Sequence, residues 1–216
     1  MKLVGFGCSF TYGSELIAPD DTHWTAYRNE HCWLGQLAKY FNCKFDNLAE
    51  PANSDHAIQH QVADYIRNRL DPQEQIIICV GWTSPERMSW YDDHWTHNGF
   101  VDRKHGWTQS AKEWVMRTGH DPKSHNMFTE NAKLFVNSVC KNYNITILQF
   151  NALGQHKTTV YENYYADGYT MDTMLKRAEQ EDSSKILFAS DGHPNEQGHK
   201  YFAKRLHLFA KERIIL

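Results

Sequence analysis

The sequence predicts an α/β domain in which helices cover both faces of a parallel sheet. Short apolar runs alternate with amphipathic helical patterns along the 216 residues, which is typical of repeated β-α units. The run from Gln75 to Gly81 is nearly continuous and rich in Ile, as expected of a strand buried on both faces. At roughly 150 residues per domain, this length favours one domain with insertions over two domains.

Short strands are expected at 2–6, 44–48, 75–81, 145–150 and 186–189, and all but 44–48 are apolar runs. Each expected helix carries apolar residues three or four positions apart: 33–41, 55–70, 127–143, 171–181 and 195–211. Ser54 and Asn195 are suited to cap two of these helices. Function in such sheets gathers at the carboxyl ends of the strands. The loops at that edge are the places to look for a site: 7–13, 49–54, 81–87, 151 onward and 190–199.

Residues 82–125 interrupt the alternation. They are rich in Trp, His, Asp and Gly without a clear apolar period, so we expect a surface excursion with one short helix near 111–117. The chain is thus expected to be a single domain, 1–216, with an aromatic-rich insertion at about 82–125. Aromatic rings suit stacking on sugars as well as burial. The alternatives are a wall of the substrate cleft or a small satellite core, with Arg87 in an ion pair. The substrate-binding candidates are Trp82, Arg87, Trp90 and Trp95.

Composition argues against several classes of partner. The chain holds 23 Lys and Arg against 26 Asp and Glu, with a pI near 6.5, so we expect no polycationic face for nucleic acid or anionic lipid. No apolar run approaches the length of a membrane span. The first ten residues reach Gly, Cys and Ser too early for a signal peptide, so a cytoplasmic location is expected when the protein is made.

The sequence gives little reason to expect a functional cysteine or a metal site. The five cysteines form no Cys-x-x-Cys pair, and we expect buried thiols, Cys8 among them, instead of disulfides or a thiol nucleophile. The segment DDHWTH, from Asp92 to His97, has the residue types of metal ligands but lacks helical spacing, which favours a solvated loop. No metal site is therefore predicted. His199 is expected to pack or cap within the last helix.

Two loops carry residue types that suit nucleophilic catalysis. In GFGCSFTYGSE, Ser9 comes directly after the first strand, although a turn alone would also explain a Ser near Gly. In SDGHPNEQGH, Asp191 lies close to His193, and an acid near a His can orient the imidazole as a general base. A capping Asp with a surface His is the alternative. Both loops are expected at one edge of the sheet, which favours the catalytic interpretation.

Four segments resemble the motif blocks of the SGNH (GDSL-like) hydrolases: GCSFTYG, NLAEPANSD, VGWTSPER and DGHPNEQGH. The likeness is greatest to the small SGNH-like proteins of tailed bacteriophages and bacteria. This resemblance implies a flavodoxin-like three-layer α/β/α sandwich with a central parallel sheet of about five strands. It also implies a serine esterase that removes acyl groups, often acetyl groups on sugars, without a metal or cofactor.

The resemblance implies a role for five residues. Ser9 would be the nucleophile, His193 the general base and Asp191 the acid that orients it. The backbone N–H groups of Ser9 and Ala52, with the Thr83 hydroxyl, would form the oxyanion hole. Ala52 stands where the family has Gly, and Thr83 stands where the pattern Gly-x-Asn-Asp has Asn. One residue, instead of the usual two, separates Asp191 from His193.

Two functions remain open. The leading hypothesis is an esterase of small acyl esters, with O-acetyl groups on carbohydrate as one substrate class. The alternative is a catalytically weak or inactive binding protein that keeps the fold, associated with the virion if the chain is phage-encoded. The altered oxyanion block motivates this alternative, because losing one oxyanion donor costs about 10²- to 10³-fold in kcat. The sequence leaves the oligomeric state open.

Overall fold

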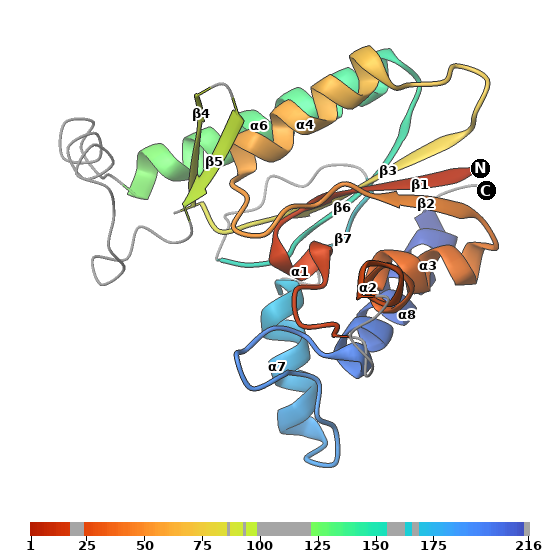
Figure 1. The fold of residues 1–216 in the computed structure, drawn as a ribbon, viewed down its shortest axis with the longest axis vertical. Helices are drawn as coiled ribbons and strands as arrows, with labels where there is room; N and C mark the ends of the chain where they lie inside the picture. Colours follow the sequence, from red (N-terminus) through yellow and green to blue (C-terminus); the bar gives the residue numbers. More distant parts are fainter. Residues whose placement is uncertain are drawn as a thin grey trace.

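The protein forms a three-layer α/β/α sandwich in the computed structural model, which describes residues 1–17, 24–85, 87–92, 94–98, 122–154, 163–165 and 169–213. A five-stranded sheet lies in the middle, with α4 (Asp55–Asn68) and α6 (Pro122–Asn142) on one face (Figure 1). The helices α3 (Trp33–Phe41), α7 (Met171–Glu181) and α8 (Glu196–Arg213) cover the other face. The α/β class and the layered arrangement expected from the sequence are therefore confirmed.

All neighbouring strands in the sheet are parallel, in the order β2-β1-β3-β6-β7. Their bounds are β1 (Lys2–Gly7), β2 (Lys44–Asn47), β3 (Ile76–Trp82), β6 (Thr146–Asn151) and β7 (Tyr164–Tyr165). Four of these five strands lie where the sequence predicts them.

The fifth expected strand, 186–189, is wrong. This segment makes a single bridge, from Phe188 to Pro194, and the side chain of Asn195 binds the carbonyls of Ile186 and Phe188. Its backbone groups are used to fold the loop before the last helix and not to extend the sheet. The short strand β7 occupies the sheet edge instead.

The helices follow the expected periodicity in all but the two earliest cases. Their bounds are α1 (Ser9–Tyr12), α2 (Trp24–His31), α3 (Trp33–Phe41), α4 (Asp55–Asn68), α6 (Pro122–Asn142), α7 (Met171–Glu181) and α8 (Glu196–Arg213). Ser54 Oγ accepts the Ala57 N–H at 3.3 Å, and Asn195 Oδ1 accepts the Gly198 N–H at 3.0 Å, so both predicted caps are confirmed. The sequence did not predict α1, which has only four residues, or α2, whose mostly polar residues form no apolar stripe.

The start of the insertion is more regular than expected. β4 (Met88–Asp92) and β5 (His94–Asn98) form an antiparallel hairpin, in which Trp90 lies opposite Thr96 and Tyr91 lies opposite Trp95. Aromatic and β-branched residues favour such cross-strand positions. The expected helix at 111–117 lies outside the described residues, as does the rest of the insertion from 99 to 121. Residues 122–125, expected to end the insertion, belong to α6.

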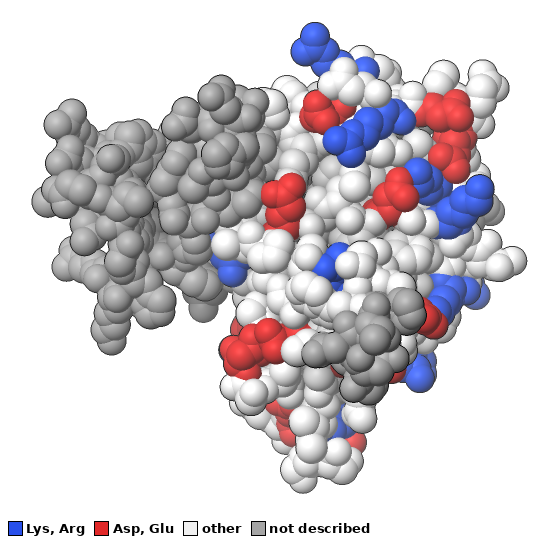
Figure 2. All heavy atoms as spheres, in the orientation of Figure 1, with Lys and Arg blue, Asp and Glu red and all other residues white. Residues whose placement is uncertain are grey.

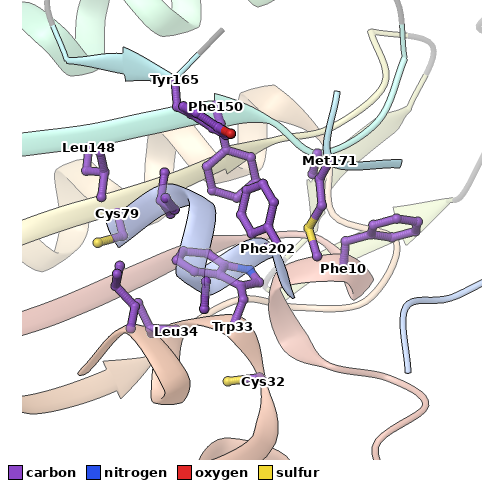
Figure 3. Close-up of a cluster of buried hydrophobic side chains, with 14 of the residues drawn as sticks. Phe10, Cys32, Trp33, Leu34, Cys79, Leu148, Phe150, Tyr165, Met171 and Phe202 are labelled. Carbon is purple, nitrogen blue, oxygen red and sulfur yellow. The ribbon is translucent and has the colours of Figure 1, made fainter. Parts of the chain in front are cut away.

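The core has one apolar cluster on each face of the sheet. Leu3, Cys79 and Leu148 point toward α3 and α8, while alternate strand residues such as Val4 and Ile78 point toward α4 and α6. This alternation is what a strand covered on both faces requires. In the first cluster, the rings of three residues pack edge to face or tilted, with centroids 4.6 to 5.9 Å apart: Trp33, Phe150 and Phe202 (Figure 3).

Two glycines let α1 pack directly against the ends of β1 and β3. Gly7 and Gly81 are register partners, and a Cβ on them would lie 2.3 and 2.5 Å from Thr11 Oγ1. No side chain fits at either position, so the first turn of α1 rests on the strand ends. This contact places Ser9, the first residue of α1, at the carboxyl edge of the sheet.

The surface in the view of Figure 2 carries both signs of charge side by side. All five cysteines are free thiols, four of them buried, which agrees with the expectation that they do not build a disulfide framework. Among the described helices, none combines the length and apolar character needed to cross a bilayer.

Candidate active site

Ser9 lies where the strand-end argument predicts it. It is the residue after Cys8, which caps the four-residue helix α1, and its side chain is only 5% exposed. Within the described part of the chain, Ser9 Oγ has no hydrogen-bond partner. No hydrogen bond within the described residues therefore fixes the direction of this hydroxyl.

Asp191 and His193 form a hydrogen-bonded pair in the loop between α7 and α8. Asp191 Oδ2 lies 2.5 Å from His193 Nδ1, and Asp191 Oδ1 accepts the backbone N–H of His193 at 3.0 Å. Gly192 between them has a φ of +86°, a left-handed conformation that favours glycine. A Cβ there would meet nothing within 4 Å, so Gly192 is needed for its backbone and not for space. This turn lets a single intervening residue bring the acid onto the imidazole.

His193 lies beside the segment that carries Ser9. Its ring lies 5.5 Å from the ring of Phe10, the residue after Ser9, measured between centroids. The loop of the acid–base pair and the first loop thus meet at one edge of the sheet. The hydrogen bond from Ser9 to the imidazole, which a serine hydrolase uses, is not among those formed by the described residues.

Ala52 has a left-handed backbone conformation, which favours glycine. Its φ is +59°, one of few such values at a non-glycine residue in the described chain. The neighbouring Asn53 fixes this loop, because its Nδ2 donates to the Gly7 carbonyl at 3.2 Å and to Gln61 Oε1 at 2.8 Å. The left-handed turn is thus kept despite the added Cβ.

Thr83 follows β3 and is fully buried. Its backbone N–H donates to Asp55 Oδ1 at 2.7 Å, and the other oxygen of Asp55 accepts the Thr129 hydroxyl at 2.8 Å. The loop after β3 is therefore held by a carboxylate at the start of α4 and tied to α6. The backbone N–H of Thr83 is used in this bond, so only its hydroxyl remains as the expected oxyanion donor.

Asp55 is a residue that sequence reasoning missed. Burial raises its pKa to about 6, although the hydrogen bonds from Thr129 and Thr83 and the charges of Lys133 and Arg87 act in the opposite direction. In the sequence, an Asp directly after the cap Ser54 is explained by a helix start. Its place directly after the loop at 49–54 was the available signal, because the loops at that edge are where functional polar groups gather.

The residues expected to bind substrate lie in different surroundings, and for some of them the structure describes no side chain. Trp82 belongs to β3, is fully buried in the core beside α4 and α6, and donates from Nε1 to Gln149 Oε1 at 3.1 Å. It is therefore a core residue and not part of a cleft wall. Arg87 is partly buried near Asp55. Its positive charge favours the ionised form of Asp55 and so acts to lower the pKa of that carboxyl group. The side chains of Trp90 and Trp95 lie outside what the structure describes, as do those from Asp92 to His97.

His199 and Cys8 are buried residues of the protein interior. His199 is buried, its Nδ1 accepts the backbone N–H of Trp33 at 3.1 Å, and burial lowers its pKa to about 3. A neutral imidazole that accepts a backbone donor in the core explains this residue. Cys8 is fully buried, as expected, in the apolar cluster that contains Trp33 and Phe202.

Comparisons with known proteins place the fold. No protein-family model and no curated protein matches the chain. The structure is similar to an acetyl xylan esterase from the rumen bacterium Butyrivibrio proteoclasticus, with a TM-score of 0.53 and 15% identity over 99% of this chain and 64% of that one. It is also similar to a carbohydrate esterase whose active site is described as having divergent catalytic and non-catalytic binding functions, with a TM-score of 0.50 and 12% identity over 99% and 65%.

This chain thus spans just under two thirds of the length of those two proteins. A third similar structure, a member of the lipolytic protein G-D-S-L family from Veillonella parvula, aligns over 99% of this chain and 98% of its own, at 16% identity and a TM-score of 0.41. The chain has the fold of the two carbohydrate-acting esterases, at TM-scores of 0.50 and 0.53. At its carboxyl edge, this fold presents a serine on one loop and an acid–histidine pair on another.

Proposed function

We propose that this protein is a serine ester hydrolase of the SGNH type that acts on small acyl esters, with O-acetyl groups on carbohydrate as the favoured class. The observation that carries the proposal is the Asp191–His193 pair at 2.5 Å, whose imidazole lies against Phe10, next to Ser9. An imidazole oriented by a carboxylate beside a serine hydroxyl is the arrangement that activates a serine nucleophile.

The proposed reaction follows from these positions. Ser9 Oγ attacks the ester carbonyl while His193 Nε2 takes its proton, and Asp191 stabilises the imidazolium through Nδ1–H. The oxyanion is held by the N–H groups of Ser9 and Ala52 and by the Thr83 hydroxyl. The imidazolium then protonates the leaving alcohol. Water, activated by His193, hydrolyses the acyl-enzyme and frees Ser9 for another cycle.

The acetyl-carbohydrate preference has separate support. Two structural neighbours with TM-scores of 0.50 and 0.53 are named as a carbohydrate esterase and an acetyl xylan esterase. The insertion also begins with a hairpin that carries Trp90, Tyr91 and Trp95, residue types that stack on sugar rings. We propose that this hairpin forms a wall of the substrate cleft.

The experiment that tests the reaction measures release of p-nitrophenol from p-nitrophenyl acetate by the wild type and by Ser9→Ala. We expect the variant to lose the activity, while Ser14→Ala, in the same segment, keeps it. A fluorophosphonate probe should label the wild type and not Ser9→Ala. Equal rates for wild type and Ser9→Ala would overturn the proposal.

The cleft wall is tested with acetylated xylan oligosaccharides. Trp90→Ala and Trp95→Ala should each raise KM for the oligosaccharide and leave kcat for p-nitrophenyl acetate near the wild-type value. Trp24→Ala, which removes an exposed tryptophan on α2, is the matched control. An unchanged KM in both hairpin variants would remove the hairpin from the proposal.

A non-catalytic binding function is the second candidate. The observation that favours it is Ser9 Oγ, which makes no hydrogen bond within the described chain, together with Thr83 in place of the family's Asn. One structural neighbour is itself described as having non-catalytic binding functions. This candidate predicts no fluorophosphonate labelling of Ser9, with retained binding of acetylated oligosaccharides in calorimetry.

A further inference from the structure

The hydrogen bonds between Asp191 and His193 lie within one loop. Asp191 Oδ2 meets the ring, and Oδ1 accepts the backbone N–H of the same residue. These bonds orient the acid relative to the imidazole. They do not fix the pair relative to Ser9, which lies on a segment far away in the chain. A serine hydrolase needs that second relationship just as much, because misplacing the base by 1 Å can cost about 10²-fold.

Glu15 supplies a contact between the two segments. One carboxylate oxygen of Glu15, one of Asp191 and a ring nitrogen of His193 all lie within 4.8 Å of one another. Glu15 follows α1 in a turn closed by the bonds from the Gly13 and Ser14 N–H groups to the Ser9 carbonyl. Its position is therefore tied through the backbone to the proposed nucleophile.

The turn that carries Glu15 is anchored in the core. Leu16, the next residue, is 2% exposed and belongs to the apolar cluster that includes Cys8 and Phe10. Asp191 and His193, in contrast, keep 38% and 27% of their side chains exposed. The better-anchored segment can thus hold the more exposed one.

Two carboxyl groups in contact repel each other unless they share a proton. The pKa of Glu15 is raised by its hydrogen bond with Asp191, by burial and by the Asp191 charge, while the charge of His193 opposes the shift. Burial raises the pKa of Asp191, but the hydrogen bonds from the His193 backbone, the His193 ring and Glu15 together hold this pKa below its usual value. Between the pH values at which Asp191 and Glu15 titrate, a neutral Glu15 carboxyl group can therefore donate to an ionised Asp191.

We propose that Glu15 is a positioning residue whose carboxyl group, hydrogen-bonded to Asp191, holds the acid–base loop against the segment of Ser9. Asp191 and His193 are the titratable groups that face Glu15 in the described structure. With Glu15 neutral, Asp191 stays ionised and turned toward the imidazole. With Glu15 ionised, the two carboxylates repel each other, and the loop of Asp191 and His193 loses its hydrogen bond to Glu15. The catalytic consequence rests on the proposed function, whereas the contact itself does not.

The contact is tested without any activity, by following the side-chain carboxyl carbon of Asp191 by NMR in a pH titration of the full chain. Glu15→Ala removes the donor, so the pKa of Asp191 should move to higher pH. Glu15→Gln keeps an N–H donor at all pH values, so the titration of Asp191 should stay near that of the wild type. Glu212→Gln, an exposed glutamate near the end of α8, is the control. The same Asp191 titration in Glu15→Ala and the wild type would overturn the proposal.

The kinetic measurement uses p-nitrophenyl acetate. At a pH where Glu15 of the wild type is neutral, Glu15→Ala should lose about 10- to 100-fold in kcat with little change in KM. The acid limb of its kcat/KM profile should move to higher pH. Glu15→Gln should keep the wild-type rate at low pH and exceed it as the pH is raised and Glu15 of the wild type ionises. A parallel loss in Glu15→Gln and Glu15→Ala at every pH would contradict the positioning role.

Two further outcomes are informative. If Glu15→Ala does not fold, the comparison of Glu15→Gln with Glu15→Asp decides, because Asp keeps the charge but withdraws the carboxyl group by one methylene. We then expect Glu15→Asp to be impaired and Glu15→Gln to be active. If the wild type hydrolyses no ester, the proposed function fails, while the NMR titration still decides whether Glu15 holds Asp191.

Discussion

The backbone N–H of Thr83 donates to Asp55 Oδ1 at 2.7 Å and so joins the loop after β3 to the first turn of α4. Because Thr129 donates to the second oxygen of the same carboxylate, Asp55 connects three elements behind the proposed oxyanion hole. A buried carboxylate with two donors is costly to unpair, since each group left without a partner loses about 1–3 kcal/mol.

Asp55→Ala should therefore destabilise the protein by about 2 kcal/mol or more, because it leaves the Thr83 N–H without an acceptor. Asp55→Asn should cost less, since its amide oxygen can accept from Thr83 and the Thr129 hydroxyl can turn to accept from its amide. Urea unfolding near pH 7 measures both free energies. Equal losses in the two variants would show that the Thr83 bond contributes little.

Asp55 also makes stability depend on pH. Burial raises its pKa from 3.8 to about 6, so the folded chain binds this proton more tightly than the unfolded chain. The resulting stabilisation is complete below pH 3.8 and is lost as the pH rises to about 6. The stability of Asp55→Asn relative to the wild type should therefore rise over that window, by on the order of 3 kcal/mol. Urea unfolding from pH 4 to 7 measures the difference, and a constant difference would contradict this assignment.

His199 gives the opposite dependence. Its pKa is lowered to about 3 by burial, while the unfolded value is near 6.5, so the folded chain resists protonation of this imidazole. The stability that it contributes is present above pH 6.5 and is lost as the pH falls toward 3. His199→Asn offers an oxygen to the Trp33 N–H and cannot become charged. Its unfolding free energy should fall less on acidification than that of the wild type, as thermal or urea unfolding at pH 7 and pH 5 can show.

Ala52 should be a mildly strained position. A residue with a Cβ in a left-handed conformation costs about 1–2 kcal/mol. Replacing it by glycine removes this strain, but glycine also raises the conformational entropy of the unfolded chain, which offsets part of the gain in stability. We expect Ala52→Gly to stabilise the protein by about 0.5 kcal/mol and to keep the activity. The control is Ala57→Gly within α4, which should destabilise it by about 1 kcal/mol. Comparable losses in both variants would mean that the Ala52 turn carries no strain.

Gly192 is the residue that permits the short spacing between acid and histidine. Gly192→Ala should weaken the Asp191–His193 contact, because its φ of +86° disfavours a Cβ although space is free. We expect a loss of about tenfold in kcat with a small change in melting temperature. Gly192→Asn should lose less, because Asn tolerates left-handed φ values better than Ala does. Wild-type kcat in Gly192→Ala would show that the turn does not depend on glycine.

Much of the fold could be predicted from local patterns in the sequence. The apolar residues three or four positions apart in α4 and the continuous apolar run of β3 each predict their element from local sequence alone. Buried positions recur with the period of a helix in α4, and in β3 they are continuous because both faces of the strand are covered. Strand β7 could not be predicted, because two residues carry no period. Trp82 was misplaced because an aromatic residue after a strand suits a cleft and a core equally well, and only the packing of α4 and α6 decides between them.

For the proposed site, the sequence by itself determined which candidate residues lie in which loops: Ser9 after the first strand, and Asp191 and His193 before the last helix. Local chemistry sufficed there, because strand ends in a parallel sheet converge on one edge. Only the tertiary structure decided that Asp55 holds Thr83 and that Glu15 lies against Asp191. Those contacts join segments far apart in the chain, and a carboxylate's partner depends on how the layers pack and not on its neighbours in sequence.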